Sequence, residues 1–340
     1  MNRLLVVGAG ASIEECRRSG KYPTDATRCF PSVRNFCAKL FDPTSATLLK
    51  ATASYLQKLG VQFDQQLLEI KIGDTFTGED IKKGPVGVFI DLEAKAPEQY
   101  NIERLCEHAW HRFGNDTTFW AAFIHDGIFL HLFAIFTEQF GLGLGENMVA
   151  GRLVAEALSN GDAVLNLNYD IAFDLALKQA GKAIAYSPEV HDNTISIFKP
   201  HGSFNFYVNP QNGNCFFEEP QKISGSVGIP DPQGGVFFAQ HGIIPPRFSK
   251  SYAQHPAAEM ILGNGRPFSP RIVTFWGVGL TDSDADLLSL YREAVADARL
   301  VEFINPSLEA CENATKLLAT NLTHFLSLDQ WIASQNRQET

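Results

Sequence analysis

Continuous apolar runs recur along the chain and predict the strands of a parallel sheet. Strands that are buried on both faces carry apolar residues at successive positions, whereas half-exposed strands alternate apolar and polar residues. Runs of the first kind occur at 4–7, 163–167, 272–275 and 300–304, with a further candidate at 195–198. Helical apolar spacing follows two of them, at 171–180 and 284–298. This alternation of strand and helix predicts an α/β fold with a mostly parallel sheet.

The middle of the chain has a different pattern. Two aromatic-rich segments with helical spacing and one strand-like run between them occupy 31–59, 102–140 and 86–92. We therefore expect a mainly helical insertion at about 33–158, with an α/β core formed by 1–32 and 159–340. The segment 204–270 is rich in Gly, Pro, Asn and Phe, and we expect an irregular excursion with short strands there.

Composition narrows the class of protein. The chain has 340 residues, of which 45% are hydrophobic and 19% are charged, which is typical of a folded globular protein and not of a disordered one. Its net charge is −10, whereas a generic nucleic-acid binder carries a basic surface. We therefore expect no direct nucleic-acid partner.

Neither an export signal nor a membrane span is expected. The apolar run that follows Met1 ends at Gly8, which is too short for a signal peptide. The most apolar stretch, 119–136, contains Asp126, and an aspartate at mid-bilayer costs about 2.5–3.5 kcal/mol on insertion scales. We therefore expect a buried helix in this stretch, no membrane partner and a cytoplasmic location.

The cysteines do not predict a metal site. No two of the six have C-x-x-C spacing, which argues against a four-thiolate zinc site. His108 and His111 lie about one helical turn apart, without a third ligand nearby. We therefore predict no bound metal, and reduced, mostly buried thiols.

A glycine-rich turn follows the first predicted strand and opens the first predicted helix. In Gly8-Ala9-Gly10-Ala11-Ser12, the glycines allow backbone N–H groups to approach a phosphate, and the helix N-terminus adds about half a positive charge. A third glycine at position 13 would complete the dinucleotide fingerprint, but Ile13 stands there. The alternative is a tight turn without a ligand.

Polar residues or glycines also follow later predicted strands. Asn168 and Asp170 come after one strand, where they could line a ligand pocket or cap the next helix. His201, between Pro and Gly, comes after another, and it is either aimed into a site or structural. Gly277 and Gly279 form a second glycine turn after the strand 272–275.

These motifs occur in an order that resembles the NAD-binding domain of sirtuins. The order is Gly8-Ala9-Gly10-Ala11-Ser12, Asn168-Tyr169-Asp170, His201-Gly202, Gly277-Val278-Gly279 and Ile304-Asn305-Pro306. Two further stretches, 101–105 and 243–250, resemble prokaryotic sirtuin-like defence proteins. The resemblance implies a Rossmann-like sheet and gives the residues roles. The NAD pyrophosphate would be held by Gly8, Ala9, Gly10, Ala11 and Ser12. Asn168 and Asp170 would line the nicotinamide and ribose pocket, and His201 would be the general base. Gly277 and Gly279 would pass beneath the adenosine half, and Asn305 would contact the adenosine ribose.

The chain also departs from the protein-deacylating sirtuins. Those enzymes carry a four-cysteine zinc module after the histidine motif, whereas 202–270 contains only Cys215. Leu167 stands where they usually have glutamine, and their deacylase motif has no counterpart after Ser12. The departures imply an NAD+ hydrolase that uses water as the acceptor, and the resemblance implies an NAD-depleting effector in antiphage defence, acting as a homo-oligomer or with a companion protein. The alternatives are an NAD-dependent protein deacylase or ADP-ribosyltransferase, and a non-catalytic NAD or ADP-ribose sensor.

Overall fold

A computed structural model of the chain provides the architecture. It describes all residues except 26–27, 32–34, 69–77, 142–146, 190, 210–214, 221–227, 231–235, 239, 245–255, 264–268, 282–284 and 339–340. The described residues divide into two compact units. Unit 1 comprises Met1–Phe30, Phe136–Ile244 and 256–338, and unit 2 comprises Pro31–Ile135.

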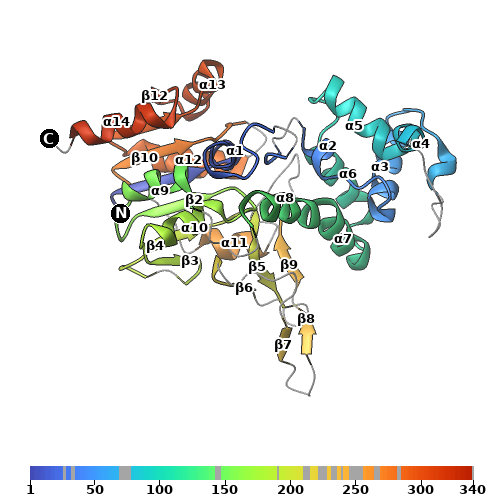
Figure 1. The fold of residues 1–340 in the computed structure, drawn as a ribbon, viewed down its shortest axis with the longest axis horizontal. Coiled ribbons are helices and arrows are strands. Elements are labelled where there is room, and N and C mark those ends of the chain that lie inside the picture. Colours follow the sequence, from blue (N-terminus) through green and yellow to red (C-terminus); the bar gives the residue numbers. More distant parts are fainter. Residues whose placement is uncertain are drawn as a thin grey trace. The chain divides into compact units, whose positions relative to one another are not determined.

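Unit 1 is built on a seven-stranded sheet in which every neighbouring pair of strands is parallel (Figure 1). In spatial order the strands are β12 (Thr323–Phe325), β11 (Leu300–Ile304), β10 (Ile272–Trp276), β1 (Arg3–Val7), β2 (Ala163–Asn166), β4 (Ile195–Phe198) and β3 (Ile184–Tyr186). The apolar runs did predict five of these strands, and the α/β, Rossmann-like fold class is confirmed. The two strands that were not predicted, β3 and β12, have three residues each and lie at the sheet edges.

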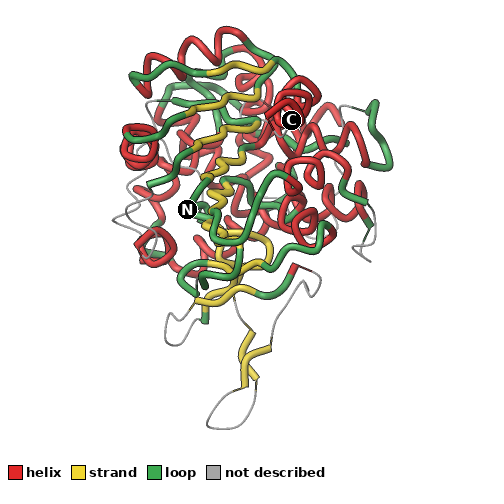
Figure 2. Tube along the Cα trace, turned by 90° about the vertical axis from the view of Figure 1, so that its left-hand side faces the viewer, coloured by secondary structure: helices red, strands yellow, loops and turns green. Residues whose placement is uncertain are grey.

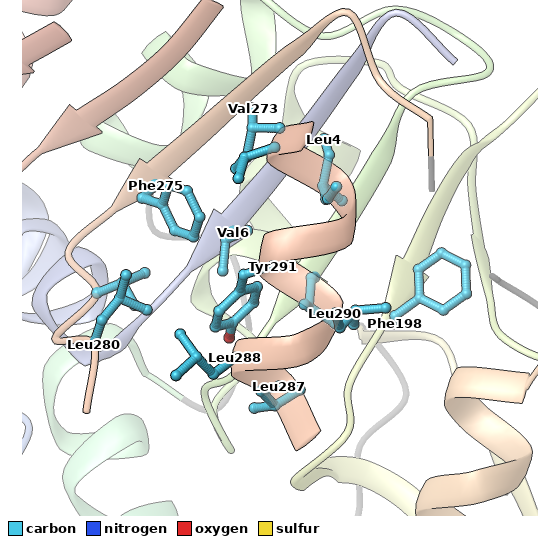
Figure 3. Close-up of a cluster of buried hydrophobic side chains, with 14 of the residues drawn as sticks. Leu4, Val6, Phe198, Val273, Phe275, Leu280, Leu287, Leu288, Leu290 and Tyr291 are labelled. Carbon is cyan, nitrogen blue, oxygen red and sulfur yellow. The ribbon is translucent and has the colours of Figure 1, made fainter. Parts of the chain in front are cut away.

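Helices cover both faces of this sheet (Figure 2). Leu4 and Val6 of β1 and Val273 and Phe275 of β10 point to one face, where Tyr291 and the leucines of α12 pack against them (Figure 3). This face is covered by α11 (Pro256–Gly263), α12 (Ala285–Ala296) and α13 (Leu308–Leu318). The burial of each such leucine stabilises the fold by about 1.5–3 kcal/mol.

The intervening side chains of the strands point to the opposite face, because successive residues of a strand alternate. Trp276 of β10 contacts Phe173 there, with ring centroids 5.8 Å apart, and Arg3 of β1 lies over the ring of Trp331. The helices of this face are α1 (Ala9–Ser19), α9 (Val149–Glu156), α10 (Ala172–Gln179) and α14 (Leu328–Gln338).

The chain diverges between β1 and β10. After β1 it continues to β2 on one side, whereas after β10 it continues to β11 on the other. Val7 is in register with Trp276 on one neighbour and Asn166 on the other, so three strands end at one level. Ligands of open α/β sheets bind outside the carboxyl ends of the strands at such a divergence.

The segment after His201 forms short antiparallel strands. One small sheet contains β6 (Cys215–Phe217), β5 (Gly202–Val208) and β9 (Gln240–Ile243), and a second pairs β7 (Gly228–Pro230) with β8 (Val236–Phe238). Short strands were predicted in this part of the chain.

The described part of unit 2 consists of helices. They are α2 (Phe36–Leu40), α3 (Ala46–Lys58), the 3₁₀ turn η2 (Gln65–Leu68), α4 (Gly78–Lys83), α5 (Pro85–Lys95), α6 (Ile102–Phe113), α7 (Thr117–Ile124), the π turn η3 (His125–Phe129) and the first half of α8 (Leu130–Phe140). Phe89 lies at the centre of an aromatic core, with its ring 6.0 Å from Tyr55 and 6.3 Å from Phe41.

The strand predicted at 86–92 was wrong, because this run is part of α5. A short apolar run does not by itself distinguish a buried strand from a buried helix. Pro85 occupies the first turn, where proline's fixed φ suits a helix, and Val86 and Phe89 share the buried face at a helical spacing.

Within the described part of the chain, one helical stretch, Thr117–Phe140, is long and apolar enough to cross a membrane. It has 24 residues and a mean hydropathy of 1.6, and 44% of its most apolar window is buried in the structure. A core helix of a soluble protein meets the same criterion of length and composition.

Candidate functional site

The two predicted glycine turns pack directly on each other at the ends of β1 and β10. The N–H of Gly8 donates to the Trp276 carbonyl at 3.0 Å, and the N–H of Gly10 donates to the Gly277 carbonyl at 2.9 Å. A Cβ on Gly8 would lie 2.6 Å from the Gly277 oxygen, and a Cβ on Gly10 would lie 2.8 Å from the Gly277 Cα. Gly277 itself has a φ of +63°. These three glycines are therefore required by backbone contact alone.

Two neighbouring residues of these turns remain accessible. Ala9 and Gly279 are exposed, and a Cβ on Gly279 would meet no atom within 4 Å. By contrast, the N–H groups of Gly10 and Ala11 already donate to protein carbonyls. A ligand at this divergence would thus meet Ala9 and Gly279 first.

Asn168 is fixed by two hydrogen bonds that define the orientation of its carboxamide. Its Nδ2 donates to the Gly8 carbonyl at 3.0 Å and to the Ser12 hydroxyl at 2.8 Å. A carbonyl oxygen can only accept, so the amino end of the side chain must face Gly8. The carboxamide oxygen is then the side-chain atom that can accept a hydrogen bond from a ribose hydroxyl or a water.

Ser12 links Asn168 to Asp170. Its hydroxyl donates to Asp170 Oδ2 at 2.7 Å, and because a hydroxyl has one proton, it accepts from Asn168. The other carboxylate oxygen of Asp170 accepts the N–H of Ala172, in the first turn of α10, at 2.9 Å. Burial raises the pKa of Asp170, and the nearby Lys199 ammonium partly opposes this shift. Asp170 therefore both binds the first N–H of α10 and supports Asn168 through Ser12.

His201 lies on the three-residue turn that joins β4 to β5. Its Nδ1 lies 2.9 Å from the carbonyl oxygen of Leu167, the residue directly before Asn168. Since the carbonyl can only accept, Nδ1 carries the proton, and in the neutral ring the lone pair is on Nε2. The side chain is half-buried. This tautomer suits a base that accepts a proton at Nε2.

Further hydrogen bonds hold the Asn168 loop to the His201 segment. The Tyr169 carbonyl accepts from the N–H of Phe204 at 2.9 Å and from the Ser203 hydroxyl at 3.2 Å. The Tyr169 hydroxyl donates to the Ile244 carbonyl at 2.9 Å, and the N–H of Ile244 donates to the His201 carbonyl at 2.8 Å. The structure therefore brings two of the predicted residues, Asn168 and His201, onto adjoining segments.

Asn305 connects the ends of β10 and β11. Its Nδ2 donates to the Val278 carbonyl at 3.2 Å, and its Oδ1 accepts the N–H of Ser307 at 2.9 Å. The Asn305 side chain thus holds the second glycine turn through the Val278 carbonyl. Contact between Asn305 and an adenosine ribose stays a prediction.

The described residues contain no group of three or more His, Cys, Asp or Glu that could hold a metal ion. His108 bonds the Ser54 hydroxyl at 2.9 Å, and His111 pairs with Glu107 at 2.8 Å. The six cysteines, all within the described part, are free thiols. Cys16, Cys37 and Cys106 are buried, and the others are half-buried.

Of the two stretches that resemble prokaryotic defence proteins, 101–105 is described by the structure and 243–250 mostly is not. Asn101 is the N-cap of α6, and its Oδ1 accepts the N–H of Arg104 at 3.0 Å, so 101–105 forms a helix start. Of 243–250, only Ile243 and Ile244 lie within the described residues.

The sequence did not predict a role for Lys199 or Asp174. Both are fully buried beside the Asn168 loop and form an ion pair of 3.0 Å. Lysine directly before Pro-His was the only local signal, and its partner is 25 residues away.

Comparison with known proteins finds no matching family model and no matching curated protein. Among solved structures, a Sir2 homologue in complex with NAD is 11% identical, with a TM-score of 0.42, and the match covers 100% of this chain and 91% of that one. A triple-mutant Sir2 homologue in complex with 2'-O-acetyl ADP ribose is 13% identical, with a TM-score of 0.39 and coverage of 99% and 92%. A mutant Sir2 homologue in complex with ADP ribose is 13% identical, with a TM-score of 0.36 and coverage of 94% and 90%. At these identities and scores the likeness assigns no function to this chain.

Proposed function

We propose that unit 1 binds NAD+ and hydrolyses the bond between nicotinamide and ribose, giving nicotinamide and ADP-ribose. The observation that carries this proposal is that one carboxamide and one imidazole lie on adjoining segments at the carboxyl end of a parallel sheet. The hydrogen bonds of Asn168 leave its carboxamide oxygen as the acceptor, and the Nδ1 bond of His201 leaves the lone pair on Nε2. The two residues belong to segments that are hydrogen-bonded to each other.

The chemistry requires few protein groups. The nicotinamide nitrogen of NAD+ is already cationic, so the base leaves neutral and needs no general acid. The ribose then resembles an oxocarbenium ion, as in glycoside cleavage. Asn168 would hold a ribose hydroxyl or the attacking water, and His201 would accept the proton that the water loses. General base catalysis contributes about 10²–10⁴-fold, which corresponds to about 3–5 kcal/mol.

The glycine turns at the strand ends would hold the rest of the dinucleotide. Ala9 and Gly279 are the exposed positions of the two turns, and α1 points its N-terminus toward the same level. Ser12 and Asp170 would act through Asn168. We propose NAD+ as a substrate and no metal in the reaction.

The biological role follows from the resemblance of the sequence to prokaryotic sirtuin-like defence proteins. We propose an effector in antiphage defence that depletes NAD when its host cell is challenged. Uncontrolled cleavage would harm the host, so activity would depend on assembly into a homo-oligomer or on a companion protein. A cytoplasmic location is part of this proposal.

The test is to incubate the purified protein with NAD+ over a range of protein concentrations and to quantify nicotinamide and ADP-ribose. His201→Ala and Asn168→Ala should each reduce cleavage by at least about 10²-fold while leaving the fold intact. His191→Ala and Asn193→Ala, at exposed positions of the same unit, are the matched controls. Parental rates in His201→Ala would refute the proposed base.

The same assay separates the alternatives. Cleavage that requires an acylated peptide would favour a deacylase, and transfer of label from NAD+ onto protein would favour an ADP-ribosyltransferase. Binding of NAD+ in calorimetry without any product would favour a sensor.

A further inference from the structure

A lysine ammonium is completely buried behind the candidate site. Lys199 directly follows β4 and is 0% exposed, as is Asp174 of α10. The Lys199 Nζ donates to Asp174 Oδ2 at 3.0 Å and to the Asp170 carbonyl oxygen at 2.7 Å. Lysine is almost never fully buried without a charged partner, so this pair is a specific feature of the fold.

The Asp174 carboxylate accepts hydrogen bonds from residues of several elements. Its Oδ1 accepts from Asn166 at the end of β2 at 2.9 Å, and its Oδ2 accepts from the Tyr186 hydroxyl at the end of β3 at 3.0 Å. Burial raises the pKa of Tyr186 well above its ordinary value, so the phenol stays protonated and donates. With Lys199, the carboxylate therefore joins the ends of three neighbouring strands to α10.

Stability alone does not explain a buried ion pair. Removing each charge from water costs several kcal/mol, and well-packed apolar residues in place of such a pair are often as stable or more stable. What apolar residues would not supply is the bond from Lys199 to the Asp170 carbonyl, which ties one loop to the next.

That bond joins the two segments that carry the proposed chemistry. Asp170 is two residues after Asn168, and Lys199 is two residues before His201. The turn from Lys199 is closed by the N–H of Gly202, which donates to the Lys199 carbonyl at 2.9 Å. The ammonium therefore ties together two backbone segments, at points that each lie two residues from a proposed site residue.

The geometry points to Lys199 and Asp174 as a pair of positioning residues that holds Asn168 and His201 in one arrangement toward the same ribose. This inference rests on the proposed function for its kinetic consequence. A displacement of about 1 Å at a reacting group can reduce the rate by about 10²-fold. Both side chains are fully buried, so we expect no contact with the substrate and little change in binding of the nucleotide.

The test is the double variant Lys199→Met with Asp174→Asn, which removes both charges and nearly conserves the volumes. Removing only one partner would leave an uncompensated buried charge, whereas the double variant avoids that penalty. We expect kcat for NAD+ cleavage to fall by about 10²-fold and KM to change by less than about threefold.

The matched control is a second buried ion pair of unit 1. Arg3 Nη1 lies 2.7 Å from Glu302 Oε2, and both side chains are nearly inaccessible. The pair involves the first residue of β1, at the strand end opposite to the glycine turn. The double variant Arg3→Met with Glu302→Gln should retain kcat within about twofold at temperatures at which it is folded.

A second readout does not depend on turnover. In ¹⁵N-histidine-labelled protein, the nitrogen signals of His201, assigned with His201→Gln, report which ring nitrogen carries the proton. The parental protein should show the Nδ1–H tautomer, and the Lys199→Met, Asp174→Asn variant should show a mixture of tautomers. An unchanged His201 spectrum, or a parental kcat, in this variant overturns the positioning role. Failure of the parental protein to cleave NAD+ would count against the proposed function, and the spectrum would still decide the role of the pair.

Discussion

Gly277 should be indispensable to the fold of unit 1, whereas Gly279, two residues later, should not. Alanine at position 277 would have to adopt the φ of +63°, which costs about 1–2 kcal/mol for a residue with a Cβ. Its Cβ would also overlap the backbone N of Ala11 and the backbone of Gly10, and overpacking of this kind costs about 1–3 kcal/mol. We therefore expect Gly277→Ala to lose about 2–5 kcal/mol, a large part of the 5–15 kcal/mol that stabilises a typical domain.

Gly279→Ala is the matched control, because its Cβ would enter open space and Gly279 is not among the glycines with positive φ. It should leave the stability unchanged or raise it by up to about 1 kcal/mol, since alanine restricts the unfolded chain. Urea unfolding followed by tryptophan fluorescence measures both, in a background with Trp110→Phe and Trp120→Phe so that the remaining tryptophans report on unit 1. A Gly277→Ala variant as stable as the parent would refute the packing argument.

The Gly279→Ala variant also tests the predicted contact between Gly279 and NAD+. If Gly279 passes beneath the adenosine half of NAD+, the added methyl costs about 1–3 kcal/mol of binding, and KM should rise by about tenfold with kcat unchanged. An unchanged KM would remove Gly279 from the proposed binding site without affecting the proposed base.

Three further predictions concern other parts of the chain. The Glu15 carboxylate accepts hydrogen bonds from the first N–H groups of α9 at distances from 2.6 Å. In urea unfolding, Glu15→Gln should therefore lower the free energy of unfolding by about 1–3 kcal/mol. The control Glu14→Gln, on a partly exposed helix face, should lower it by less than about 1 kcal/mol. Burial lowers the pKa of His108 below 6.5, so the contribution of the neutral ring to the stability of unit 2 is present above pH 6.5 and is lost as the pH falls through the lowered pKa. Thermal unfolding at several pH values should show this pH dependence in the control His111→Gln and not in His108→Gln. Ser12→Ala removes the hydroxyl between the site carboxamide and carboxylate, and it should reduce NAD+ cleavage by about tenfold without unfolding the protein; a parental rate would show that this link is dispensable.

The central strands of unit 1 were predictable because a parallel sheet buries both of their faces. In β1 every residue from Leu4 to Val7 is fully buried, and an uninterrupted apolar run is the direct consequence. The edge strands β3 and β12 lack this signal, because their residues are only half-buried or exposed. The 86–92 run was misassigned because apolar content specifies burial and not the type of element.

The candidate site was predictable only as far as local motifs reach. The glycine turns were identified, but the sequence could not separate a turn that binds a ligand from one that packs against a neighbouring strand. The structure shows that Gly8, Gly10 and Gly277 pack closely against each other, and contact of these turns with NAD stays a prediction. Lys199 and Asp174 were missed because their pairing depends on the order of strands in the sheet, which no local pattern encodes.

The polar groups of the site divide by where their hydrogen bonds go. The side chains of Ser12 and Asp170 form hydrogen bonds with other protein groups, so substituting either residue would act on the site by displacing a neighbouring side chain. Asn168 and His201 each donate a side-chain N–H to a backbone carbonyl, which leaves the carboxamide oxygen and the Nε2 lone pair as their acceptor atoms. A carboxamide oxygen and an imidazole lone pair suit a ligand rich in hydroxyl groups and a water that must lose a proton better than an anionic group. Under the proposed function, this polarity favours the ribose and its attacking water, and not a phosphate, as the part of NAD+ that would contact them.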